Sequence, residues 1–106
     1  MEEFKLEDLQ EEVIETLKTL YDPEIPVNIY DLGLIYEIKV NEAGEVKVVM
    51  TLTSPMCPVA EILPEQVGRA IKEINIVTKV DVEVVWDPPW NQNMMSEEAR
   101  LELNLF

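Results

Sequence analysis

Apolar and polar side chains alternate along two stretches in the middle of this chain, residues 34–40 and 46–52, which are joined by a polar turn. Alternation with a period of two is typical of strands that bury one face. The turn, residues 41–45, favours an antiparallel hairpin with Gly44 at a positive φ. We expect one face of the first strand to carry Leu34, Tyr36, Ile38 and Val40, and the opposite face to carry Ile35, Glu37 and Lys39.

Helical periodicity flanks this hairpin on both sides. Residues 6–21 repeat apolar side chains at helical spacing and carry acidic side chains on the other face, which predicts an amphipathic helix that ends at Asp22-Pro23. We interpret the acidic face as solvated. A second helix is expected from Pro58 to about Ile74, with Ile62 among its buried residues. Because Pro64 cannot donate a helix hydrogen bond, we expect a kink near Ala60 or a separate first turn.

A third alternating stretch follows the second helix. Residues 80–86 predict a strand that places Trp86 on the apolar face together with Val80, Val82 and Val84. The usual right-handed crossover makes this strand parallel to the second one, although its neighbour in the sheet stays open. Ser96 is expected to cap a final helix that contains Ala99, Leu101 and Leu105.

These elements predict an α/β chain of the α+β two-layer type. The order is helix, strand, strand, helix, strand, helix, with a three-stranded mixed sheet and both main helices on one face. The apolar residues of that face are expected to be Leu34, Val48, Met50, Val82 and Val84. The other face, with Ile35, Val49 and Val85, is too apolar to be fully wet, and either the tail with Trp90, Met94 and Met95 or a second copy of the chain is expected to cover part of it.

The composition of the chain excludes several classes of function. With 106 residues, of which 47% are hydrophobic, residues 1–106 are expected to form a single domain. A formal net charge of −14 makes nucleic acid and anionic membranes poor partners. The chain contains no histidine and one cysteine, which disfavours most hydrolytic and zinc chemistry and excludes an internal disulfide. No leader or membrane span is recognisable, so we expect a cytoplasmic protein.

The cysteine, Cys57, lies where the strand pattern changes to a helical one. Because Pro58 suits the first position of a helix, Cys57 is the expected N-cap residue, and the positive end of the helix dipole would favour its thiolate. The alternative is a buried cap whose sulfur has no chemical role. The nearby Glu61 and the acidic background oppose ionisation.

Three segments resemble the signatures of a small iron-sulfur assembly domain family, which includes a SUF-system auxiliary factor (SufT-like), the PaaD-type protein of phenylacetate degradation and the cytosolic iron-sulfur targeting factors. They are Asp22-Pro23-Glu24-Ile25-Pro26-Val27 with Asp31-Leu32-Gly33-Leu34-Ile35-Tyr36, the cysteine segment Thr51-Leu52-Thr53-Ser54-Pro55-Met56-Cys57-Pro58, and Trp86-Asp87-Pro88-Pro89-Trp90 with Met95-Ser96-Glu97-Glu98-Ala99-Arg100. The match covers roughly residues 6 to 103. The chain has neither the cysteine-rich C-terminal region of PaaD-type members nor the nucleotide-binding domain of P-loop relatives, so it is most similar to the SUF-associated form.

The resemblance implies a non-enzymatic role in maturing iron-sulfur proteins, as an adaptor or transient carrier. It places Cys57 at the reactive, cluster-binding position and implies a transient iron-sulfur cluster without a nucleotide. The expected partners are scaffold or carrier proteins and apo target proteins, and a homodimer is possible. The motif loops supply the further candidate site residues Asp22, Glu24, Asp31, Thr53, Pro55, Pro58, Trp90, Ser96 and Arg100.

One cysteine cannot by itself hold a four-iron cluster, which usually has four thiolate ligands. Two chains could share a cluster, with Asp22, Glu24, Asp31 or a small thiol completing the shell. Alternatively, Cys57 could be one labile ligand during transfer, or the protein could bind no metal and bring scaffold and target together. Two other classes of function stay open: an acidic interaction module without metal chemistry, and a thiol enzyme that uses Cys57, which would have no histidine as its base.

Overall fold

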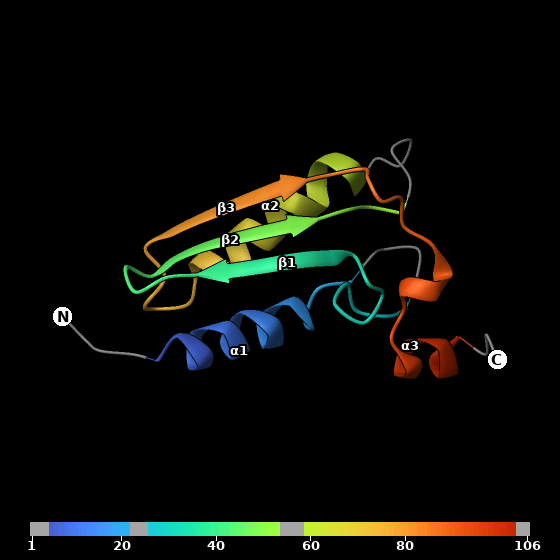
Figure 1. Cartoon of the computed structure of the whole chain (residues 1–106), viewed down its shortest axis with the longest axis horizontal. Coiled ribbons are helices and arrows are strands. Elements are labelled where there is room, and N and C mark those ends of the chain that lie inside the picture. Colours follow the sequence, from blue (N-terminus) through green and yellow to red (C-terminus); the bar gives the residue numbers. More distant parts are fainter. Residues whose placement is uncertain (1–4, 22–25, 54–58, 104–106) are drawn as a thin grey trace.

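The computed structural model describes residues 5–21, 26–53 and 59–103. Its elements are α1 (Leu6–Leu17), β1 (Ile35–Val40), β2 (Glu45–Met50), α2 (Val59–Lys72), β3 (Lys79–Val84), the short 3₁₀ helix η1 (Gln92–Met94) and α3 (Glu97–Glu102). Figure 1 shows α1 and α2 beside a three-stranded sheet, with α3 beyond the sheet end where β2 and β3 finish. The predicted α+β architecture is therefore confirmed. No helix among the described residues is long and apolar enough to cross a membrane.

The strands lie in the order β1-β2-β3, so β2 is the central strand. The β1–β2 pair is antiparallel and the β2–β3 pair is parallel, as the hairpin pattern and the crossover predicted. Gly44 has a φ of 80° in the hairpin turn, and a Cβ atom there would collide with the backbone oxygen of Ile76. The hairpin turn therefore packs directly against the connection between α2 and β3.

A bulge in β1 changes the predicted assignment of its faces. Ile35 pairs with Met50 but Glu37 pairs with Val49, so Tyr36 is an extra residue in this strand. An extra residue reverses the alternation on one side of the bulge. Ile35 consequently packs against the core and does not belong to the opposite sheet face, which corrects the prediction for this residue.

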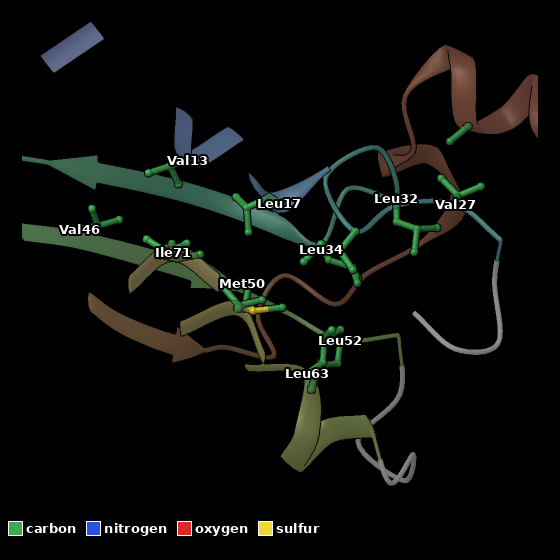
Figure 2. Packing of buried hydrophobic residues seen from close by; sticks show 14 of the residues in the cluster. Val13, Leu17, Val27, Leu32, Leu34, Val46, Met50, Leu52, Leu63 and Ile71 are labelled. Atoms are coloured by element: carbon green, nitrogen blue, oxygen red, sulfur yellow. The ribbon is translucent and has the colours of Figure 1, made fainter. Parts of the chain in front are cut away.

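The core lies between the helices and the sheet. Figure 2 shows its buried side chains extending from Val13 and Val46 at the hairpin end to Leu32 and Val27 at the opposite end. Leu9, Val13 and Leu17 of α1 and Leu63, Val67 and Ile71 of α2 are buried, as their helical spacing predicted. Thus the hydrophobic cluster continues beyond the sheet and beneath the loop that precedes β1.

The helices differ from the predictions in three places. First, α1 ends at Leu17, four residues before the end of the apolar repeat at Tyr21. Tyr21 is 53% exposed and forms an isolated β-bridge with Asn28. Asp22-Pro23, the predicted end of the helix, lies outside the described residues. Second, α2 includes Pro64 in one uninterrupted helix, so a separate first turn is wrong. Pro64 is the sixth residue of α2, so the helix continues through it although its missing N–H leaves the Ala60 carbonyl without its usual donor. Third, Ile62 is 54% exposed instead of buried.

The end of β3 provides the last correction. β3 ends at Val84, and only the backbone N–H of Val85 continues the pairing, by donating to the Met50 oxygen over 2.8 Å. Trp86 lies beyond this bond and is 45% exposed, so its predicted place in the core is wrong. Because the strand ends two residues before Trp86, the alternation of β3 does not determine which way this side chain faces.

Candidate functional site

Three segments that are distant in the sequence meet at the sheet end opposite the hairpin. They are the loop 28–34, the residues 51–53 that follow β2, and the residues 85–100 that follow β3, which we call the closing segment. Backbone hydrogen bonds join them: Thr51 N donates to Leu34 O over 2.8 Å, and Ser96 N donates to Asp31 O over 2.8 Å. The same end of the sheet therefore holds part of each of the three signature segments.

Loop 28–34 is a compact turn built around two polar side chains. The Asn28 amide oxygen accepts from Asp31 N over 2.8 Å, and the Asn28 amide nitrogen donates to the Asp31 carboxylate over 2.8 Å. Ile29, Leu32 and Leu34 are fully buried beneath this turn. Asp31 thus uses a carboxylate oxygen to hold the loop, as residues of its type commonly do in turns.

The closing segment packs directly on this loop. The indole N–H of Trp90 donates to Leu32 O over 2.7 Å, and the side chain of Trp90 is half-buried against the core. Gly33 has a φ of 84°, and a Cβ atom there would collide with the Met94 carbonyl. Glycine is therefore required at this position both for its backbone conformation and for the close approach of the closing segment.

Ser96 and Arg100 stabilise the closing segment internally. The Ser96 hydroxyl accepts from Ala99 N over 3.1 Å, which confirms Ser96 as the N-cap of α3. Arg100 donates to the Asn93 side-chain oxygen over 3.2 Å. Ala99 is buried, whereas Leu101 is 62% exposed, and Leu105 lies outside the described residues.

Tyr36, the extra residue of the β1 bulge, connects β1 to the closing segment. Its hydroxyl donates to Pro88 O over 2.7 Å and lies 3.5 Å from the Met94 sulfur. Burial raises the pKa of the Tyr36 hydroxyl, the neighbouring Thr51 hydroxyl opposes this rise, and the Asp87 carboxylate adds to it. The hydrogen bond to the Pro88 carbonyl requires the neutral phenol as its donor.

Thr51 and Thr53 lead from β2 toward the cysteine. Thr51 is fully buried, and its hydroxyl lies close enough to Tyr36 to affect that residue's pKa, yet has no partner with good hydrogen-bond geometry among the described residues. Thr53 is half-buried. Five predicted site residues lie outside the described residues, so their roles stay predictions: Asp22, Glu24, Pro55, Cys57 and Pro58.

The structure thus joins Asp31 to Ser96 by a direct hydrogen bond and attaches Trp90 to Leu32, the residue after Asp31. Thr53 lies two residues after the Thr51–Leu34 bond. The sequence patterns did not reveal the roles of Asn28 and Gly33 in the loop, or of Tyr36 as a donor to the closing segment. The separation of Asn28 and Asp31 by three residues is a turn signal that could have identified the first pair. Within the described ranges, no three carboxylate or thiol side chains gather as metal ligands.

The chain is similar to known proteins over most of its length. The model of a family described as "Iron-sulfur cluster assembly protein" matches residues 10–84. A Fe-S protein maturation auxiliary factor of Porphyromonas gingivalis is 49% identical over 94 residues, which cover 89% of this chain and 90% of that protein. The Fe-S protein maturation auxiliary factor SufT of Staphylococcus aureus is 39% identical over 84 residues, covering 79% of this chain and 96% of that protein. The crystal structure of a domain of unknown function from Bacillus anthracis superimposes with a TM-score of 0.86 at 32% identity, covering 94% of this chain and 95% of that one.

Proposed function

This chain belongs to the family of iron-sulfur cluster assembly proteins, and we propose that it is a maturation factor for iron-sulfur proteins that acts as an adaptor or transient carrier through Cys57. The two named relatives are both maturation auxiliary factors, and each is covered over most of its length. The proposed role is non-enzymatic. The cluster is cargo that passes between partner proteins.

The observation that carries this proposal is the convergence of the three signature segments at one end of the sheet. The strand before the cysteine segment is held by the bond from Thr51 N to Leu34 O, and the loop containing Leu34 is in turn bonded to the closing segment through Asp31 and Trp90. This network joins residues 51–53, the start of the cysteine segment, to the loop and the closing segment, and we call it the platform. A hydrogen-bonded support at the start of this segment suits a residue that must present its thiolate to different partner proteins.

We propose Cys57 as a single, labile iron ligand during transfer. A donor's thiolate would leave an iron atom as the Cys57 thiolate binds it, and an acceptor's thiolate would later replace Cys57 in the same way. Asp31 already accepts a hydrogen bond from Asn28, which favours a structural role for this carboxylate over ligation. The partner proteins would therefore supply the remaining ligands of a four-thiolate cluster.

This role requires protein partners and a reducing compartment. The partners are iron-sulfur scaffold or carrier proteins and apo target proteins, and a homodimer could form around a shared cluster. The cytoplasm is the proposed compartment, because reducing conditions there keep a lone thiol available. The domain is proposed to comprise the whole of residues 1–106, with Asp31, Trp90, Ser96 and Arg100 shaping the platform.

Anaerobic native mass spectrometry after incubation with iron and sulfide tests the carrier role. The wild type and Cys57→Ser are compared, because serine is similar in size and is a good N-cap residue. A small thiol such as dithiothreitol is included in place of the partner thiolates, since one cysteine cannot complete the shell. Cluster mass on the wild type and its absence from the variant are then expected. Spectra of the apo protein in both cases would contradict the carrier role and favour an adaptor that binds no metal.

A complementation assay tests the wider role in maturation. Cells depleted of the protein should regain iron-sulfur enzyme activity with the wild type but not with Cys57→Ser, while both proteins have the same melting temperature. Full rescue by Cys57→Ser would contradict the proposed use of the thiol and would favour the alternative, an acidic interaction module without metal chemistry.

A further inference from the structure

A groove runs between α1 and the connection from α2 to β3. It consists of two adjoining hollows of about 280 and 650 Å³, which share Glu12, Glu15 and Ile76 in their walls. The second wall comes from residues 73–76, which follow α2. We call this feature the α1 groove.

The α1 groove combines an apolar base with an acidic rim. Leu9 is buried at the base, and Ile74 and Ile76 are half-buried there and pack against the core. The carboxylates that line it, all on exposed residues, belong to Asp8, Glu11, Glu12, Glu15 and Glu73. The groove therefore offers both a hydrophobic contact surface and a concentrated negative potential.

Among the described residues, no lysine or arginine forms an ion pair with these carboxylates. The three ion pairs among the described residues are Glu37–Lys39, Glu83–Lys47 and Glu65–Arg69, and none includes a groove carboxylate. Lys72 is directed to the Thr78 carbonyl at 2.6 Å, and Lys18 lies over the Tyr30 ring. Within the described part of the chain, none of the eight lysines and arginines lines the groove.

We propose that the α1 groove docks a basic, amphipathic segment of a protein partner. Its lysine or arginine side chains would pair with the acidic rim, and its apolar side chains would contact Ile74 and Ile76, as in helix-in-groove recognition. A second copy of this chain is a poor occupant, because each copy carries a net charge of −14 and would bring further negative charge to the rim. The interpretation of the acidic face of α1 as merely solvated is replaced by this proposal.

The groove lies near the hairpin, at the opposite end of the sheet from the closing segment (Figure 1). The connection that forms its second wall is bonded to the hairpin, since Thr78 N donates to Gly44 O over 2.8 Å, and the hairpin is at the opposite end of the sheet from the closing segment (Figure 1). A partner could thus be held by the groove while the platform stays accessible. The inference rests on the proposed adaptor role and adds the chemistry by which a partner is recognised.

An NMR titration of the ¹⁵N-labelled apo protein tests the groove without any cluster. The probe is a short synthetic peptide of lysine and leucine at helical spacing, and a lysine-only peptide of equal charge is the comparison. We expect amide shifts concentrated in α1 and in residues 73–76, with weaker binding of the lysine-only peptide. Shifts spread evenly over the acidic surface, or equal affinity for both peptides, would overturn the proposal.

Two charge-matched variants make the test specific. Glu12→Gln/Glu15→Gln/Glu73→Gln should weaken binding of the amphipathic peptide about tenfold, since it removes three exposed ion pairs that are individually weak. Glu97→Gln/Glu98→Gln/Glu102→Gln changes the net charge equally on α3 and should leave affinity nearly unchanged. Equal weakening by both variants would show general electrostatic attraction only. Neither a cluster nor Cys57 takes part in this titration. A negative result would therefore refute docking in the groove without bearing on the mass-spectrometric test of Cys57.

Discussion

Replacing Trp90 by phenylalanine tests whether the closing segment is anchored as the structure shows. The substitution keeps an aromatic ring but removes the indole N–H that donates to Leu32 O over 2.7 Å. The carbonyl of the buried Leu32 then loses this donor, which costs about 1–3 kcal/mol. With an unfolding entropy of about 2 cal/mol/K per residue, a cost of about 2 kcal/mol lowers the Tm of a chain of this size by roughly 9 °C.

The matched control is Trp86→Phe. Trp86 is 45% exposed and lies beyond the last strand pairing of β3, so we expect a change within about 0.5 kcal/mol. Urea unfolding followed by far-UV circular dichroism gives both free energies, and an unchanged m-value shows that the comparison is valid. Equal destabilisation by the two substitutions, or no effect of Trp90→Phe, would refute the assignment of these two indoles.

Two further predictions follow from burial and from the pKa of Tyr36. Leu63→Ala should lower the free energy of unfolding by about 2–5 kcal/mol because Leu63 is fully buried. Ile62→Ala should lower it by less than about 1 kcal/mol because Ile62 is 54% exposed. Similar urea midpoints for the two variants would show that α2 is rotated from its described orientation. Burial raises the Tyr36 pKa above its ordinary value of 10.0, so its contribution to stability is complete below pH 10 and declines as the pH rises above 10. Tyr36→Phe should lower the free energy of unfolding at neutral pH and flatten this decline, and an unchanged slope in urea titrations from pH 8 to 11 would contradict the burial of the phenol.

Local patterns in the sequence identified most elements correctly. The period of two in residues 46–50 and the helical spacing around Val13 and Val67 predicted their buried faces, because each pattern records which side of one element meets the core. The positive φ of Gly44 and the cap at Ser96 were also predictable, since both depend on nearby residues only.

The same reasoning failed where one residue changes the geometry of its neighbours. The extra Tyr36 in β1 reversed the predicted face of Ile35, and a periodic pattern contains no sign of which residue a bulge inserts. Trp86 followed the alternation of β3, but the strand ends at Val84. Strand ends depend on where the pairing partner stops, which lies elsewhere in the chain.

Some features of the candidate site were recognisable from the sequence, and others depend on the tertiary structure. The sequence alone identified Cys57, its position between a strand and a helix, and the three signature segments, because residue types and their order are enough to recognise a family. Tertiary structure alone decided that Asp31 meets Ser96, that Trp90 meets Leu32, and that α1 and residues 73–76 enclose an acidic groove. These contacts join residues far apart in the chain, and their formation depends on packing around one shared core, which no local pattern records.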